Sequence, residues 1–121
     1  NIDWKKTLGD EWRQYEKVFP ALAASRIDQV SLECIHSHVP AELMALLKGK
    51  DVMVGVIDVA SETIETADEV ADTIGRALQF VPRERLIACT NCCLAPMSRA
   101  VAEAKLRALG EGAALARQRH R

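Results

Sequence analysis

The chain has 121 residues, of which 49% are hydrophobic and 27% are charged, and its 16 basic and 17 acidic residues leave a formal net charge of −1. This composition is typical of one soluble globular domain and excludes a disordered chain. The near-neutral charge argues against nucleic acid or a membrane surface as partner, and no apolar run is long enough to span a bilayer. Because no signal sequence opens the chain, the expected location is the cytoplasm. The chain starts at Asn1 rather than Met, which is consistent with a piece of a longer protein.

The N-terminal part of the chain predicts a helix, a short strand and a second helix. Residues 9–25 carry apolar side chains at the spacing of an amphipathic helix, which Pro20 is expected to kink or split. The apolar positions of that helix are Trp12, Tyr15, Phe19 and Leu22. Residues 28–34 alternate as a strand does, and residues 40–49 predict a helix followed by Gly49 as its C-terminal stop.

The middle of the chain predicts a buried strand followed by a capped helix. Residues 51–59 form a nearly unbroken apolar run rich in Val and Ile, as in a strand buried on both faces of a parallel sheet. Thr66 and Glu69 have the spacing of a capping box, in which each residue satisfies the backbone of the other. Apolar residues then recur on one face of the predicted helix until Pro82 ends it.

The C-terminal part predicts one more strand and one more helix. Residues 85–90 form the third strand, and a long Ala-rich helix follows from about Pro96, weakened locally by Gly110 and Gly112. Strands that alternate with helices of this length indicate a parallel sheet. The predicted fold class is therefore α/β.

Polar residues follow each of the predicted strands. Glu33 ends the first strand, Asp58 ends the second, and Cys92 lies just past the third. The carboxyl ends of parallel strands lie on one side of the sheet, so these residues are expected to converge where such folds carry their chemistry. Each also has a structural interpretation: Glu33 could cap a helix or face solvent, and Asp58 could hydrogen-bond to a loop.

Three of the four cysteines lie in the segment ACTNCCLAP at residues 88–96. The spacing of Cys89 and Cys92 resembles a redox motif, but Cys89 belongs to the strand and Cys93 would have no role. A structural zinc site would need a second cysteine pair, which this sequence lacks. A single Cys92 thiolate at an open catalytic zinc, with Glu33 contributed by a neighbouring strand, fits best.

The segment ECIHSH at residues 33–38 also has the composition of a metal cluster. His36 and His38 in a strand-to-helix loop are more often polar surface than metal ligands. Cys34 faces away from Glu33 by strand alternation and is expected to pack in the core.

The segments VSLEC, GKDVMVGVIDVAS, ETADEVADTIGRAL, VPRERLIACTNC and AVAEAKLRAL are similar to the carboxyl-terminal catalytic domain of cobalamin-independent methionine synthases, in particular the short forms. The similarity runs in the same order over nearly the whole chain. It implies a (β/α)8 barrel that transfers a methyl group to the thiol of homocysteine, activated on zinc. The methyl donor implied is methyltetrahydrofolate or a methylated corrinoid protein.

The resemblance also implies roles for particular residues. Glu33 and Cys92 match two of the family's zinc ligands. Asp58 and Ser61 match a motif at the mouth of the active site and are expected to bind substrate. Zn²⁺ would deprotonate a bound thiol outright, so no catalytic triad is required.

Three features depart from the family pattern. The His-x-Cys pair that completes the zinc ligands belongs shortly before the region where this chain begins. Cys93 stands where the family usually has Gly. Ala60 replaces the His that folate-using members carry between Asp58 and Ser61, which favours the short forms and a different methyl carrier.

A complete barrel of this kind needs about 250 residues. Residues 1–121 are therefore expected to be the carboxyl-terminal part of the catalytic barrel, about its last three strand–helix units preceded by one helix. An isolated three-stranded sheet would leave its edges exposed, so we expect it to associate with the rest of the barrel or with itself. The alternative is a non-catalytic half-barrel or assembly module that has lost its metal site.

Overall fold

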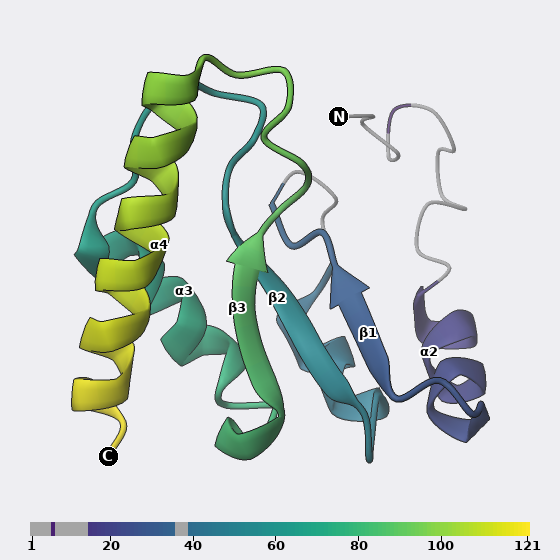
Figure 1. Ribbon diagram of the computed structural model, residues 1–121. Helices are drawn as coiled ribbons and strands as arrows, with labels where there is room; N and C mark the ends of the chain where they lie inside the picture. The colour runs from purple at the N-terminus through teal and green to yellow at the C-terminus, as the bar shows by residue number, and fades with distance from the viewer. Residues whose placement is uncertain (1–5, 7–14, 36–38) are drawn as a thin grey trace.

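The computed structural model describes residues 6, 15–35 and 39–121, and the elements in this part of the chain alternate between helix and strand (Figure 1). They are α2 (Tyr15–Ala24), β1 (Gln29–Leu32), the 3₁₀ helix η2 (Ala41–Leu46), β2 (Asp51–Ile57), α3 (Ala67–Ala77), the 3₁₀ helix η3 (Arg83–Arg85), β3 (Leu86–Thr90) and α4 (Arg99–Arg119).

The three strands form one parallel sheet in the order β1-β2-β3. Ser31, Met53 and Ile87 lie side by side across it. All three strands therefore end at the same edge, the upper edge in Figure 1. The α/β fold class is confirmed, and the arrangement is that of a partial (β/α)8 barrel.

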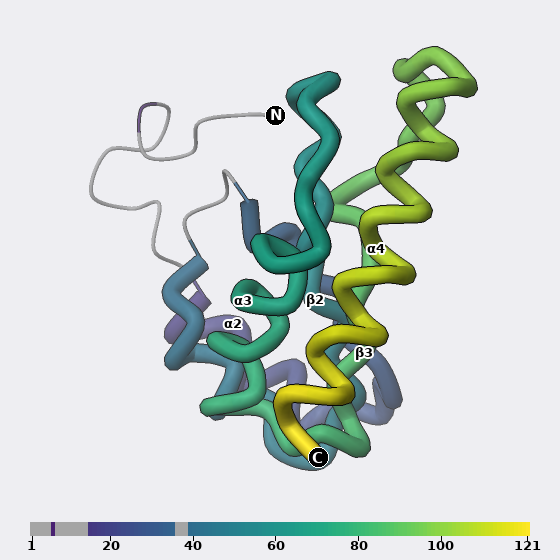
Figure 2. Tube along the Cα trace, turned by 90° about the vertical axis from the view of Figure 1, so that its left-hand side faces the viewer, coloured from purple at the N-terminus to yellow at the C-terminus, as the bar shows by residue number. Residues whose placement is uncertain are grey.

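Helices cover one face of this sheet. Val52 and Val54 of β2 are each only 1% exposed and point toward this helical layer, as the strand alternation requires. Figure 2 shows α3 and α4 side by side in front of β2 and β3. Most of the hydrophobic core lies between these helices and the sheet, and Phe19 of α2 extends it next to η2.

Helix α3 confirms the predicted capping box. The Glu69 backbone N–H donates to Thr66 Oγ1 at 3.2 Å, and the Thr66 backbone N–H donates to Glu69 Oε2 at 2.8 Å. The Thr66 N–H and, at 3.0 Å, the Thr66 hydroxyl both donate to the Glu69 carboxylate, and these two bonds lower its pKa. The helix ends at Ala77, before Pro82, and its predicted apolar face is buried at Val70 and Ile74.

Helix α4 begins later than predicted and uses one of its glycines differently. Ser98 caps it by accepting a hydrogen bond from the Val101 backbone N–H at 3.3 Å, so the helix starts at Arg99 rather than near Pro96. A Cβ atom on Gly112 would lie 2.3 Å from the Cβ of Val70. Gly112 is therefore a position where α4 approaches α3 closely, a packing role that helix propensity alone does not indicate.

Two further details differ from expectation. The segment predicted as a helix from Pro40 is a short 3₁₀ helix, in which the Leu47 N–H donates to the Met44 carbonyl at 3.0 Å. This helix ends at Leu46 with Leu47 as its C-cap, so the prediction that it runs to Gly49 was wrong. Gly49 instead turns the chain before β2 with a φ of 79°, which side-chain-bearing residues rarely adopt. Helix α2 continues through Pro20 without a break, while Trp12 lies outside the described residues.

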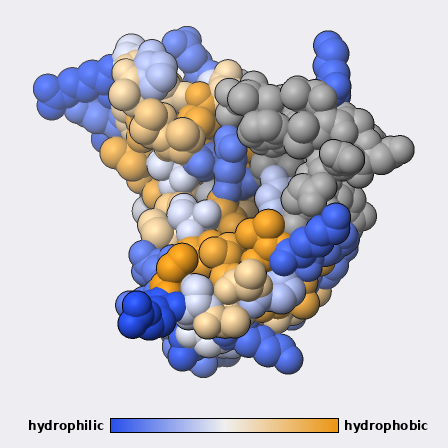
Figure 3. Space-filling model, turned by 90° about the vertical axis from the view of Figure 1, so that its right-hand side faces the viewer, coloured by the Kyte–Doolittle hydropathy of each residue, from blue (hydrophilic) through white to orange (hydrophobic). Residues whose placement is uncertain are grey.

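The other face of the sheet has no helical layer among the described residues. Ile87 of β3 is 38% exposed there, and Ser31 of β1 is exposed on the same face, with Met53 of β2 between them. Hydrophobic side chains also gather in the lower half of the face that Figure 3 shows. Val18 of α2 and Ile27, which follows that helix, are 46% and 47% exposed. None of the described helices combines the length and apolar character needed to cross a membrane.

Candidate functional site

The residues predicted to form a site all lie at or just beyond the carboxyl ends of the strands. Glu33 follows β1 directly and Asp58 follows β2 directly, while Cys92 lies two residues past β3. Glu33 and Asp58 are half-buried, and Cys92 is exposed. The parallel sheet therefore brings the three to one edge, as the sequence predicted.

Asn91, directly before Cys92, connects the end of β3 to the end of β1. Its side-chain Nδ2 donates to Glu33 Oε1 at 3.0 Å and to the Ile35 carbonyl at 3.0 Å. Its Oδ1 accepts from the Ile35 backbone N–H at 2.9 Å. Asn91 is 8% exposed, so this polar network is shielded from water. One amide thus ties Glu33 to the segment that carries Cys92.

Asn91 crosses β2 to reach β1, and Gly55 of β2 makes that crossing possible. A Cβ atom on Gly55 would lie 2.7 Å from both Cα and Oδ1 of Asn91. The register between β2 and β3 also shifts between Gly55 and Ile57, and the Asn91 backbone N–H donates to the Ile57 carbonyl at 2.9 Å. The absence of a side chain on Gly55 and the shifted register together allow Asn91 to lie over β2.

The loop after β2 holds Asp58 and Ser61 through local hydrogen bonds. Asp58 Oδ1 accepts from the Ala60 backbone N–H at 2.8 Å, and Ser61 Oγ accepts from the Thr63 backbone N–H at 3.1 Å. The structural interpretation of Asp58, that it hydrogen-bonds to a loop, is therefore confirmed. Asp58 and Ser61 lie on the same loop beyond the edge that carries Glu33.

A buried ion pair between Lys105 of α4 and Glu65 holds this loop in place. The Lys105 side chain of α4 is 0% exposed, and its Nζ donates to Glu65 Oε2 at 3.0 Å and to the Thr63 carbonyl at 2.5 Å. Glu65 Oε1 accepts from the Asp58 backbone N–H at 2.7 Å. Sequence reasoning missed Lys105, because a lysine in an Ala-rich helix has the pattern of a solvated face.

The four cysteines are free thiols in different surroundings. Burial raises the pKa of the Cys34 thiol to about 11, and the carboxylate of Glu33 and the thiol of Cys89 add smaller increases. Burial also raises the pKa of Cys89, which lies within β3 as predicted. Cys92 and Cys93 are exposed, so these two thiols are the accessible ones. The prediction that Cys34 packs in the core is confirmed.

Helix α2 contributes an aromatic side chain to the same end of the molecule. The pKa of the Tyr15 hydroxyl is raised, first by burial and then by the negative charges of Glu33 and Cys34. Its ring packs against Phe19 with the ring centroids 5.6 Å apart. Tyr15 therefore lies within electrostatic range of Glu33.

The described residues contain no group of three or more His, Cys, Asp or Glu side chains placed to hold a metal ion. His36 and His38 lie outside the described residues, so their role stays a prediction. A carboxylate and an accessible thiol, tied to one edge through Asn91, have the donor chemistry of two zinc ligands. The described residues fit zinc as part of a ligand set.

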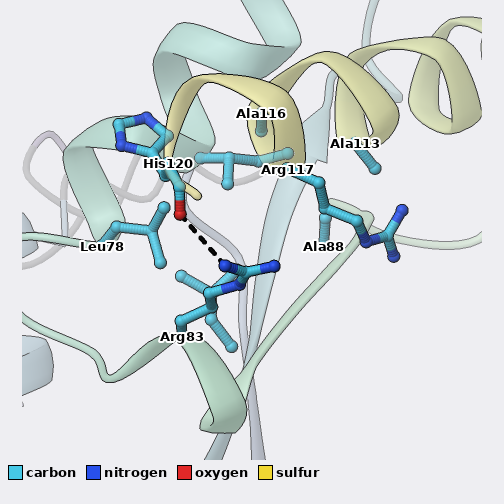
Figure 4. Close-up of a pocket in the computed structure, with 9 residues that line it drawn as sticks. Leu78, Arg83, Ala88, Ala113, Ala116, Arg117 and His120 are labelled. Atoms are coloured by element: carbon cyan, nitrogen blue, oxygen red, sulfur yellow. Dashed lines mark hydrogen bonds between the residues drawn. The ribbon is translucent and has the colours of Figure 1, made fainter.

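A cavity of about 220 Å³ lies at the opposite edge, between α3, α4 and β3 (Figure 4). Leu78 and Ala88 line its apolar side, and Arg83 Nη1 donates to the His120 carbonyl at 3.2 Å across its mouth. Arg83 and Leu86 of its lining lie just before and at the start of β3, whereas Glu33 and Cys92 lie beyond the carboxyl ends of β1 and β3. It is therefore separate from the candidate site.

Comparison with known proteins points to one family. Residues 12–115 match the family described as the cobalamin-independent synthase catalytic domain. A methionine synthase from Saccharolobus islandicus (strain Y.G.57.14 / Yellowstone #1) is 34% identical over 107 residues, which cover 87% of this chain and 32% of that protein. A 2-hydroxypropyl-CoM lyase from Xanthobacter autotrophicus (strain ATCC BAA-1158 / Py2) is 51% identical over 63 residues, 52% of this chain and 17% of that protein.

A solved structure is similar over almost the whole chain. It is a B12-independent methionine synthase from Shewanella sp. W3-18-1 in complex with selenomethionine, 60% identical, with a TM-score of 0.87. The match covers 97% of this chain and 34% of that one. The chain thus spans about a third of the length of the methionine synthases that it matches.

Proposed function

We propose, from the premise that this chain belongs to the cobalamin-independent methionine synthase family, that it is the carboxyl-terminal part of a zinc-dependent catalytic barrel that methylates the homocysteine thiol. The observation that carries the proposal is the hydrogen bond from Asn91 to Glu33, because it ties one predicted zinc ligand to the residue directly before the other, Cys92. The upstream part of the barrel would supply the remaining ligands. It would also cover the open face of the sheet.

In this proposal Glu33 and Cys92 hold the zinc ion through a carboxylate oxygen and a thiolate sulfur. When bound, zinc supplies the positive charge that deprotonates the homocysteine thiol and keeps it nucleophilic at neutral pH. Asp58 and Ser61 bind the amino acid substrate from the neighbouring loop, where a carboxylate suits its ammonium group. The methyl donor is methyltetrahydrofolate or a methylated corrinoid protein.

The similarity to the 2-hydroxypropyl-CoM lyase favours a second candidate substrate. The name of that protein says that it acts on 2-hydroxypropyl-CoM, so CoM is a second thiol that the proposed zinc site would activate. An assay that offers homocysteine and coenzyme M in parallel separates the two candidates. Methyl transfer to homocysteine alone is expected.

The proposal is tested on the full-length protein that carries this chain, by zinc content and by thiol labelling. We expect about one zinc per chain. Cys92→Ser should lose most of the zinc and most methionine formation, whereas its neighbour Cys93→Ser should keep both. Zinc should also protect Cys92 from iodoacetamide while leaving Cys93 reactive.

The competing interpretation is a non-catalytic half-barrel that keeps the fold but binds no metal. A full-length protein without zinc, or a Cys92→Ser variant with unchanged zinc content and unchanged methionine formation, would support it. In that case Glu33 and Asp58 have structural roles only.

A further inference from the structure

We propose that Asn91 is a positioning residue that sets the orientation of the Glu33 carboxylate toward the metal ion. This inference rests on the proposed function, since it takes Glu33 as a zinc ligand. Asn91 itself need not touch the metal or the substrate. Its role would be to hold the ligand of one strand from the end of another.

The hydrogen bonds of Asn91 leave little freedom for its amide. Both Nδ2 hydrogens are used, one by Glu33 Oε1 and one by the Ile35 carbonyl, each at 3.0 Å. The Oδ1 atom accepts from the Ile35 N–H at 2.9 Å. Because the amide is planar and bound on both sides, it presents its hydrogen to Glu33 in one fixed direction.

The backbone also fixes Asn91. Its N–H bonds to the Ile57 carbonyl at 2.9 Å, and its Cα lies against Gly55, where any Cβ would come within 2.7 Å. The amide can therefore neither rotate nor shift toward β2. An orientation set by both backbone and side chain is what a preorganised ligand requires.

An uncharged amide suits this task better than a charged side chain. Lys or Arg at position 91 would neutralise the carboxylate that the metal needs, and an apolar residue would leave the Ile35 N–H and carbonyl without partners. Asn91 donates one hydrogen bond to Glu33 and leaves the charge of the carboxylate intact. Partners of this kind typically change metal affinity 10–100-fold when removed.

The test measures zinc affinity of the full-length protein by competition with a chromophoric chelator. Asn91→Ala is expected to weaken zinc binding about 10–100-fold and to change the absorption spectrum of the Co²⁺-loaded protein. Asn91→Ser is measured alongside it, and if Asn91→Ala does not fold, the Ser variant decides. Melting of the zinc-free variants checks that each one is folded.

A double-mutant cycle with Glu33→Ala separates positioning from a general structural role. If Asn91 acts through Glu33, its replacement should have little further effect on zinc affinity once Glu33 is removed. Additive losses would overturn the proposal, and so would a folded Asn91 variant with unchanged affinity. If Glu33→Ala itself leaves zinc affinity unchanged, the proposed metal site fails, which is a distinguishable result.

Gly55→Ala tests the same role of Asn91 without changing Asn91 itself. Its Cβ would push Asn91 away, so zinc affinity should fall although no ligand has been changed. Gly110→Ala is the matched control, because a Cβ there has no atom within 4 Å. Unchanged zinc affinity in a folded Gly55→Ala variant would count against the proposal.

Discussion

The two polar networks at the carboxyl edge of the sheet are built from different chemistry. The junction of β1 and β3 is held by the uncharged amide of Asn91, which is 8% exposed. The loop after β2 is held by the ion pair of Lys105 and Glu65, in which the lysine side chain is 0% exposed. One network orients a predicted ligand, and the other fixes the loop that carries Asp58.

Because the two networks differ in chemistry, substitutions in them are expected to affect different properties of the protein. A buried ion pair adds little net stability, but removing one partner leaves the other charge buried without compensation. Removing the Asn91 amide takes one hydrogen bond from the half-buried Glu33 carboxylate and leaves the Ile35 N–H and carbonyl unpaired, which has a smaller effect than an uncompensated buried charge. The loop should therefore respond to substitution mainly in stability, and the junction mainly in metal affinity.

Lys105→Met should produce the largest loss of stability, about 3–5 kcal/mol in the free energy of unfolding, because it leaves the Glu65 carboxylate without its cation. Urea denaturation measures this change. The matched control is Arg99→Ala, which breaks the exposed pair with Glu103, whose side chains are 92% and 58% exposed. Such a pair contributes about 0.3–0.5 kcal/mol. Equal losses in the two variants would contradict the comparison.

Gly112→Ala should cause the second-largest loss of stability, because α4 must stay close to α3 for Lys105 to reach the loop. The added Cβ would lie 2.3 Å from Val70 Cβ, and overpacking of this kind costs about 1–3 kcal/mol. Gly110→Ala, two residues earlier in the same helix, should instead stabilise the protein by about 0.5–1 kcal/mol. Thermal melting of both variants provides the check. A gain in stability for both would show that the helices can separate without loss.

A further expected effect is on the pH dependence of the β1–β3 junction. A thiol whose pKa is raised on folding contributes stability below its ordinary value of 9.0 and loses it as pH rises toward about 11. Stability should therefore fall in this window, and Cys34→Ala should reduce the fall, whereas Cys93→Ala should not. Denaturation curves between pH 8 and pH 11 measure it. An unchanged slope in Cys34→Ala would contradict the shift.

Thiol labelling compares the reactivity of Cys34, which follows β1, with that of Cys92 and Cys93, which follow β3. At pH 8, iodoacetamide should modify the exposed Cys92 and Cys93 in the zinc-free protein and leave Cys34 unmodified. Peptide mapping identifies the modified residues. Rapid modification of Cys34 would mean that the end of β1 opens in solution.

The sequence by itself determined most of the local structure, except the 3₁₀ form of residues 41–46, and the edge on which the polar residues meet. Alternation and apolar runs located the strands, and the Thr66 and Glu69 spacing located the start of α3, because these signals come from residues within one turn or one strand. The positions of Glu33, Asp58 and Cys92 after the strands followed from the direction that parallel strands share.

Only the tertiary structure decided how that edge is held together. Asn91 and Glu33 are 58 residues apart in sequence, and Lys105 and Glu65 are 40 apart. The roles of Gly55 and Gly112 likewise depend on side chains that approach from other elements. Hydrophobic periodicity reports only the face of an element that is buried. Which partner a buried polar group finds is set by how distant elements pack, so these residues could not be assigned before the fold was known.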